Sequence, residues 1–327
     1  MSFSTDAGEM DARLRKKLSL GEFFGLLFAF FLVGIFIWLM QTGDSYPADF
    51  KIYLTGPSSP MFYYGYWIIP LFDLLNLLPF PVAYAIWSAI NILGVLFAGR
   101  VFGGRPFLAL FSYNLLSTLY YGQISGFLTG ALALLWWGIA HRKWGLAGLG
   151  FLLALTKYQV GLVLGLLLIW YGLRSWREFL KLAILPAAVG LTSLVIYPGW
   201  PFDILEKISK FPYTHLGITF WNHIGAWSLL FWLPAIALPL TKPQRFLAFF
   251  SLSTFAVPYF LQFDLLTLFS FPIGWIPLLG WLGILFPVWD MIPVYLMVIA
   301  PFLCYGIAIW PGWAKLFHKK PPVLNLL

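Results

Sequence analysis

Long apolar runs separated by short clusters of basic residues are the feature that most restricts the fold of this chain. Hydrophobic residues make up 61% of the sequence and charged residues only 10%, which excludes an ordinary soluble domain. A helix needs roughly 20 apolar residues to cross a bilayer, and lipid offers backbone groups no hydrogen-bonding partner. The runs therefore predict helices and not strands, in an all-α polytopic membrane protein with about 10–12 transmembrane helices.

The apolar segments follow one another along the whole chain. They lie at 23–40, 82–99, 107–121, 124–140, 145–156, 159–173, 182–198, 225–240, 246–262, 265–286 and 291–311. A further stretch, 62–79, begins with aromatic residues and is interrupted by Pro70. Aromatic side chains favour the membrane interface, so we expect this stretch to form interfacial helices and not to cross.

The positions of Lys and Arg predict the orientation. If 62–79 lies at the interface, five basic clusters all face the cytoplasm, as positively charged loops usually do. They lie at 13–17, 100–105, 142–143, 174–181 and 242–245. A single transmembrane domain, 1–327, then has a cytoplasmic tail at 1–22 and extracytoplasmic loops at 41–81 and 199–224. The C-terminal basic residues join the cytoplasmic side only if 265–286, which contains two prolines, folds back or crosses twice.

The first extracytoplasmic loop contains five polar or aromatic candidates, Asp44, Asp49, Lys51, Tyr53 and Tyr64. Asp44 stands next to a glycine and before Ser45, a pattern typical of a turn. Asp49 has two interpretations. It is either a helix cap, whose carboxylate accepts backbone N–H groups, or a functional carboxylate.

Five short segments resemble one protein family in their order and spacing. They are Ala48–Tyr53 (ADFKIY), Tyr64–Leu71 (YGYWIIPL), Tyr121–Leu128 (YGQISGFL), Trp144–Leu149 (WGLAGL) and Leu155–Gln159 (LTKYQ). Together they resemble the polyprenol-phosphate-mannose-dependent mannosyltransferases of glycosyltransferase family 87, in the GT-C superfamily. The similarity covers about residues 45–200 and fades after them.

This resemblance implies a helical bundle whose first long external loop carries interfacial helices and supplies an aspartate as catalytic base. Asp49 is then the predicted base of an inverting hexosyltransferase. The enzyme is expected to move a hexose, with mannose favoured, from polyprenyl phosphate to a glycolipid, glycan or protein acceptor outside the cell membrane. The chemistry needs one carboxylate, because the donor already carries its leaving group and only the acceptor hydroxyl must lose a proton.

Lys157 and Gln123 are the next candidates. Lys157 separates two apolar runs and has no acidic neighbour in sequence. An ionisable residue near membrane depth is by default a functional hypothesis, here a ligand of the donor phosphate. The alternative is a lysine that extends from a helix end toward the headgroups. Gln123 follows Gly122 and either binds sugar or phosphate or caps a helix.

The second external loop offers fewer specific candidates. Asp203, Glu206, Lys207 and Lys210 have helical spacing and predict a solvated turn with weak ion pairs. His223, just before the next apolar segment, either neutralises phosphate or is an interfacial or capping histidine. Asp264, between two apolar segments, is either a sugar contact or a loop residue.

Metals, cofactors and nucleic acid find little support in the sequence. The external loops contain no Asp-x-Asp pair or His/Cys cluster, and we expect no cofactor. The net charge of +8 is accounted for by cytoplasmic loops, so no nucleic-acid partner is implied. The expected partners are the donor, the acceptor and membrane lipids. Two other functions compete: a transporter or flippase of a lipid-linked sugar, and a non-catalytic membrane subunit.

Overall fold

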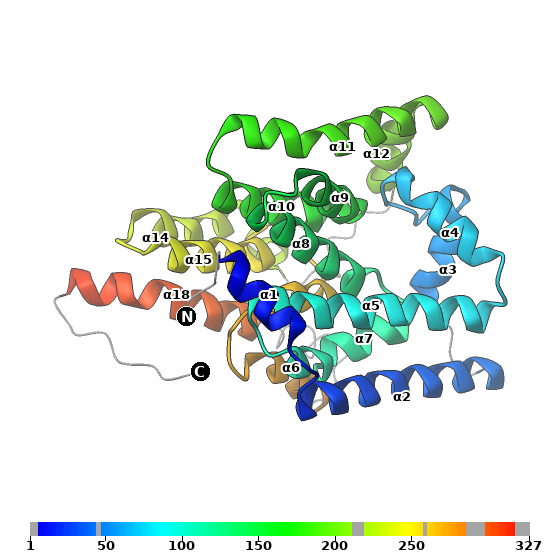
Figure 1. The fold of residues 1–327 in the computed structure, drawn as a ribbon, viewed down its shortest axis with the longest axis horizontal. Coiled ribbons are helices and arrows are strands. Elements are labelled where there is room, and N and C mark those ends of the chain that lie inside the picture. Colours follow the sequence, from blue (N-terminus) through cyan, green and yellow to red (C-terminus); the bar gives the residue numbers. More distant parts are fainter. Residues whose placement is uncertain (1–5, 44–46, 211–218, 258–259, 286–297, 318–327) are drawn as a thin grey trace.

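The computed structural model describes residues 6–43, 47–210, 219–257, 260–285 and 298–317. Throughout these ranges the chain is predominantly helical and contains no strand, which confirms the predicted all-α polytopic membrane fold. Figure 1 shows the helices packed as a bundle. Asp44 lies outside the described residues, so its predicted turn is not described.

The helices of the first half are α1 (Ala7–Arg15), α2 (Leu20–Thr42), α3 (Ala48–Thr55), η1 (Gly56–Ser58), η2 (Tyr66–Ile68), α4 (Ile69–Asn76), α5 (Phe80–Phe102), α6 (Pro106–Leu110), α7 (Tyr113–Tyr121), α8 (Ser125–Ala140), α9 (Trp144–Ala154), η3 (Leu155–Lys157) and α10 (Tyr158–Gly172). Those of the second half are α11 (Trp176–Ile196), α12 (Trp200–Lys210), α13 (Trp221–Ile224), η4 (Gly225–Phe231), α14 (Trp232–Ala237), α15 (Lys242–Phe255), η5 (Gln262–Asp264), α16 (Leu265–Phe269), η6 (Ile276–Leu285) and α18 (Ile299–Leu316).

Four described helical stretches are long and apolar enough to cross a membrane: α2, α5, α11 and Trp144–Gly172. A fifth arises if α7 and α8, bent by 115°, form one span. The stretch Trp144–Gly172 is not one straight helix, since its two ends lie close together. Gly172 packs against Ile139 and Trp136 near the C-terminal end of α8, and Trp144 lines the same cavity as Gly172. Thus α9 and α10 double back at η3. Other predicted segments form shorter helices, such as α15 with 14 residues.

Glycines allow the central helices to approach closely. A Cβ on Gly94 of α5 would lie 2.4 Å from the carbonyl oxygen of Gly126 on α8, and one on Gly130 would lie 2.8 Å from Gly94 Cα. Further along α8, a Cβ on Gly138 would lie 2.5 Å from the backbone nitrogen of Ala147 on α9. Small residues are the usual means of helix association in lipid, where no hydrophobic effect drives helices together.

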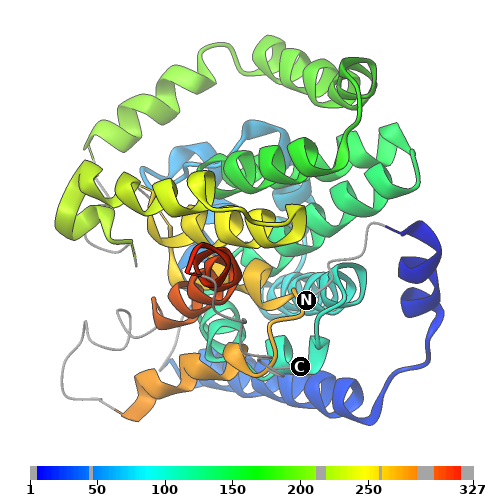
Figure 2. The ribbon, with the colours of Figure 1, turned by 90° about the vertical axis from the view of Figure 1, so that its left-hand side faces the viewer.

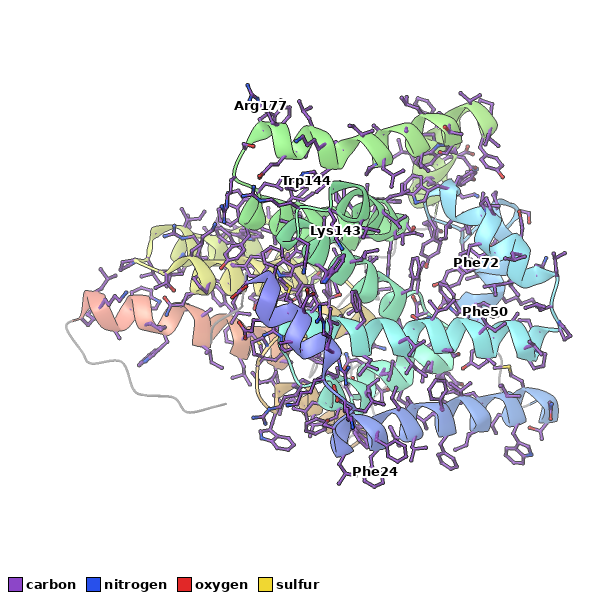
Figure 3. The ribbon with its side chains drawn as sticks, viewed as in Figure 1. Phe24, Phe50, Phe72, Lys143, Trp144 and Arg177 are labelled. Carbon is purple, nitrogen blue, oxygen red and sulfur yellow. The ribbon has the colours of Figure 1, made fainter. Side chains whose placement is uncertain are left out.

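The two ends of α5, α8 and α10 differ in character. Phe50 and Phe72 pack near the N-terminal end of α5, while Lys143, Trp144 and Arg177 lie toward the other end of the bundle, as Figure 3 shows. We call the latter the basic end. It gathers side chains from the predicted cytoplasmic clusters.

The predicted polar tail is not a free tail. Residues Ala7–Arg15 form α1, which lies against the basic end in Figure 1. Its Asp11 pairs with His141 at 3.0 Å, and Arg13 donates to the carbonyl oxygens of Arg100 and Val101. The sequence prediction overlooked this helix because it is short, four of its nine residues are charged, and only Met10 is buried.

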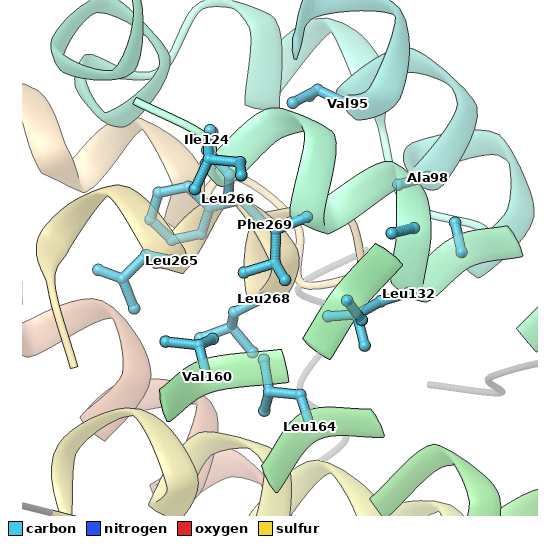
Figure 4. Close-up of a cluster of buried hydrophobic side chains, with 14 of the residues drawn as sticks. Val95, Ala98, Ile124, Leu132, Val160, Leu164, Leu265, Leu266, Leu268 and Phe269 are labelled. Carbon is cyan, nitrogen blue, oxygen red and sulfur yellow. The ribbon is translucent and has the colours of Figure 1, made fainter. Parts of the chain in front are cut away.

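The segment after Asp264 folds back. This is one of the two paths for 265–286 under which the C-terminal basic residues are expected on the cytoplasmic side. Asn114 donates to the carbonyl of Gln262 at 2.7 Å, and a Cβ on Gly280 would lie 2.7 Å from Asn114 Oδ1. Between these two points the chain reaches the basic end, where Arg105 stacks on Trp275. Figure 4 shows α16 within this segment surrounded by side chains of α5, α8 and α10.

Two long helices form opposite margins of the bundle. Both Figure 1 and Figure 2 show α2 at one margin and α11 at the other. Their outward residues are large and apolar, for example Phe31 on α2 and Ile184 on α11, each about two-thirds exposed. Such surfaces match a lipid environment, since water would strongly disfavour a patch of this extent.

Candidate functional site

Asp49 is positioned by α3, which packs through the rings of Phe50 and Tyr53 onto α5. Phe50 is fully buried, and its ring stacks on Trp87 with centroids 6.3 Å apart. Asp49 lies in the first turn of α3, whose N-cap is Pro47, and makes no capping hydrogen bond. The interpretation of Asp49 as a helix cap is therefore wrong. Its half-buried carboxylate instead points toward the break between α7 and α8.

The break between α7 and α8 supplies Gln123. Gly122 ends α7 with a φ of +69°, and a Cβ there would lie 2.5 Å from Phe50 Cβ, so a glycine is needed where α3 packs on the break. Gln123 Nε2 donates to Asp49 Oδ2 at 2.5 Å, and its Oε1 accepts from the Tyr53 hydroxyl at 3.3 Å. No side-chain bond caps α8, which makes the capping interpretation of Gln123 wrong.

Two tyrosines extend this network. Tyr53 and Tyr64 share a hydrogen bond of 3.1 Å between their hydroxyl groups, and their rings meet edge to face with centroids 4.8 Å apart. Tyr53 lies one turn after Asp49 on α3, so both residues belong to the same face of that helix. Four predicted site residues, Asp49, Gln123, Tyr53 and Tyr64, thus form one hydrogen-bonded group.

A buried ion pair lies beside this group. Lys157 Nζ is 2.8 Å from both carboxylate oxygens of Asp264, and the Ser125 hydroxyl donates to Asp264 Oδ1 at 2.7 Å. Lys157 is 2% exposed and Asp264 is fully buried. Lys157 is therefore not a lysine that extends to the headgroups, and Asp264 is not an ordinary loop residue.

The charges of the two groups act on each other. Burial raises the pKa of the Asp49 carboxyl above its usual value, against the opposing effects of the Gln123 hydrogen bond and the positive charge of Lys157. Burial, followed by neighbouring groups that include Asp49, holds the pKa of Tyr53 and of Tyr64 well above the usual range. At neutral pH both tyrosines are thus neutral hydroxyls, and Asp49 is a carboxylate that binds a proton more readily than a solvated one.

The second loop covers the first, as expected for two loops at one end. Tyr66 donates to Asp203, and Lys207 donates to the carbonyl of Pro57 at 2.8 Å. Along α12, Lys207 pairs with Asp203 and Lys210 pairs with Glu206, each four residues apart. The predicted ion-paired helical turn is confirmed. The contacts with Tyr66 and Pro57 were not predicted.

His223 lies apart from the network. It is exposed on α13, a four-residue helix whose neighbouring Phe220 bonds through its backbone N–H to the carbonyl of Phe255. The structure therefore brings together six of the predicted site residues, Asp49, Gln123, Tyr53, Tyr64, Lys157 and Asp264, and places His223 outside their contacts. Ser125, which sequence reasoning missed, is the seventh polar member. Its signal was its place two residues after Gln123.

These features define a polytopic α-helical membrane protein with a carboxylate site at one end of its central helices. Residues 62–224 match the model of glycosyltransferase family 87, and the resemblance in the sequence is thereby confirmed. The chain belongs to this family and is a membrane glycosyltransferase. The matched segment includes Gln123, Ser125 and Lys157, while Asp49 precedes it and Asp264 follows it. No curated protein and no solved structure matches the sequence.

Proposed function

We propose that this protein transfers a hexose from a polyprenyl-phosphate donor to an acceptor hydroxyl with inversion, and that Asp49 is the general base. One observation carries the proposal. Asp49 is desolvated, yet among the described residues its carboxylate accepts a hydrogen bond only from the neutral amide of Gln123, so it remains able to accept a proton. Mannose is the hexose to test first, on the basis of the resemblance.

In the proposed step the acceptor oxygen attacks the anomeric carbon of the donor sugar. The bond from that carbon to the phosphate oxygen breaks, and polyprenyl phosphate leaves with the electron pair. Asp49 takes the proton of the acceptor hydroxyl. A base with a raised pKa suits this role, because proton transfer is most effective when the pKa of the base lies close to the working pH.

The neighbours of Asp49 have supporting roles in this proposal. Gln123 fixes the orientation of the carboxylate, while the hydroxyls of Tyr53 and Tyr64 bind sugar or phosphate oxygens as neutral donors. Lys157 contributes positive charge on the side of the departing phosphate. Asp264 holds Lys157 in place, a role that its complete burial supports better than direct sugar contact.

The proposed location is the outer face of the cell membrane. Its support is the charge distribution. Arg100 lies in the last turn of α5, and Arg142 and Arg174 follow the C-terminal ends of α8 and α10, whereas Asp49 bonds to Gln123 just before the N-terminal end of α8. Loops rich in Lys and Arg usually stay in the cytoplasm. The acceptor is a glycolipid, glycan or protein hydroxyl that is reached from outside.

Transfer from radiolabelled polyprenyl-phosphate-mannose, by purified protein supplied with membrane glycolipids, tests the proposal. Wild type should form labelled glycolipid, Asp49→Asn should form almost none, and both should bind the donor. Asp73→Asn is the matched control, because Asp73 is an exposed aspartate on α4 in the same loop. Full transfer by Asp49→Asn would exclude this base. Donor flipping in liposomes without transfer would favour the transporter hypothesis.

A further inference from the structure

A cavity of about 160 Å³ lies at the basic end, away from Asp49. It is formed where the loop after α8, the loop after α10 and the start of α15 meet. Its lining includes Arg142, Arg174 and Lys242, the aromatic residues Trp144 and Tyr171, and Glu178. Three basic side chains from three separate elements therefore converge on one small space.

The positive charge in this cavity is largely uncompensated. Within the described residues, the guanidinium groups of Arg142 and Arg174 form no hydrogen bond or ion pair. Lys242 stacks over the Tyr171 ring, with Nζ 4.7 Å from the centroid. The carboxylate of Glu178, which accepts the backbone N–H of Arg174 at 2.8 Å at the start of α11, offsets one of the three positive charges.

A second basic cavity, of about 260 Å³, differs in that its arginines have structural partners. There Arg13 bonds to backbone carbonyls, Arg100 pairs with Glu22 at 3.0 Å, and Arg105 stacks on Trp275. Arg13 and Arg100 join α1, α2 and α5 to one another, and Arg105 joins the start of α6 to the segment at Trp275, so a structural role explains all three. Arg142 and Arg174 have no comparable structural role.

The backbone of Arg142 is a second, independent sign. Its φ is +55°, which makes it the one non-glycine residue with positive φ in the described parts of the chain. It occupies the turn after α8 in which Lys143 N bonds to Gly138 O at 2.8 Å, a position where glycine is favoured. The turn alone does not account for an arginine here, and strained residues of this kind cluster at binding sites.

We propose that this cavity binds the phosphate headgroup of an anionic membrane phospholipid. The lipid is favoured over free phosphate because the cavity lies at the ends of apolar helices and is lined by Trp144, a residue type that favours the interface. Beside it, α11 exposes Leu180 and Ile184, which offer an apolar surface to acyl chains. Basic pockets between helices at this depth suit such headgroups.

The test measures lipid binding to the purified full-length protein in mixed micelles by native mass spectrometry. The probes are phosphatidylglycerol, phosphatidylcholine with the same acyl chains, and inorganic phosphate. Phosphatidylglycerol should bind in preference to phosphatidylcholine. Arg142→Gly and Lys242→Gln should each weaken its binding about fivefold, as expected for one basic side chain near an anionic headgroup.

Two controls keep the result interpretable. Arg142→Gly places the residue that the turn favours, so its thermal unfolding temperature should equal or exceed that of wild type. Arg177→Gln removes an exposed charge from α11 outside the cavity lining and should leave phosphatidylglycerol binding unchanged. An equal loss with Arg177→Gln would overturn the proposal in favour of a diffuse charged surface. So would equal binding of the two lipids, or displacement of phosphatidylglycerol by millimolar phosphate.

Discussion

Asp49 and Asp264 are the same residue type in neighbouring surroundings, yet those surroundings differ in two respects. Asp49 is half-buried and receives a hydrogen bond from a neutral amide. Asp264 is fully buried, and its carboxylate accepts hydrogen bonds from a lysine ammonium and a serine hydroxyl. Charge compensation therefore distinguishes Asp49, the proposed base, from Asp264. A carboxylate bound to an ammonium has little tendency to take a proton, whereas one bound to an amide retains that tendency.

Replacement of the proposed base should have the largest effect on activity. Asp49→Asn keeps the size of the side chain and its contact with Gln123 but removes the proton acceptor. We expect kcat to fall by about 10²–10⁴ with an almost unchanged donor Kd. Initial-rate transfer assays measure kcat, and equilibrium binding measures the donor Kd. A fall in donor affinity that accounts for the whole loss would instead make Asp49 a binding residue.

Replacement of one partner of the ion pair should have the largest effect on stability. Lys157→Met leaves Asp264 buried without a counter-charge, which should cost about 3–5 kcal/mol of unfolding free energy. The double variant Lys157→Met with Asp264→Leu should recover most of that loss, since no buried charge remains. Thermal unfolding in one detergent compares them. A double variant as unstable as Lys157→Met alone would contradict this account.

The double variant also separates structure from function. If Lys157 supplies positive charge to the departing phosphate, Lys157→Met with Asp264→Leu should be stable but should transfer sugar poorly. Full activity would mean that the ion pair serves the fold alone.

Loss of the amide should change the pH dependence of transfer. Gln123 lowers the pKa of Asp49 against the raising effect of burial, so Gln123→Leu should raise that pKa further. Asp49 then stays protonated to a higher pH, and the acid limb of the kcat/KM profile should move toward higher pH. At neutral pH we expect a decrease on the order of tenfold, from the lost hydrogen bond to a charged group. If the acid limb does not move, Gln123 does not control the pKa of the group that accepts the proton.

His223 should have the smallest effect. It is exposed and lies outside the contacts of the Asp49 network. His223→Gln should change kcat/KM by about fivefold or less, because an exposed charge contributes up to about 1 kcal/mol. A larger decrease that is confined to KM for the donor would restore His223 as a phosphate ligand.

Much of the fold follows from local sequence. Apolar runs of membrane length predict the helices, and the run between Trp144 and Gly172, divided by Lys157, predicts the hairpin of α9 and α10. The charge clusters predict which loops share an end. By contrast, α1 is short and four of its nine residues are charged, and its attachment depends on contacts with Arg100 and His141 that lie far along the chain.

The site residues were predictable one by one, but their pairing was not. Lys157 and Asp264 are 107 positions apart, and Asp49 and Gln123 are 74 apart, so no helical spacing relates them. The polar character of each residue in an apolar context is visible in the sequence. Which cation meets which carboxylate depends on the hairpin at η3 and on the fold-back after Asp264, and these are properties of the packed bundle.

Asp49, and not Asp264, is the proposed acceptor of the proton. The decisive measurement is single-turnover transfer from labelled polyprenyl-phosphate-mannose by Asp49→Asn and Asp264→Asn. The rate of each variant is divided by the amount of folded protein that has bound the donor. We predict that Asp49→Asn loses the chemical step while Asp264→Asn retains most of it and is less stable. Loss of the chemical step in Asp264→Asn, together with normal turnover in Asp49→Asn, would contradict the account.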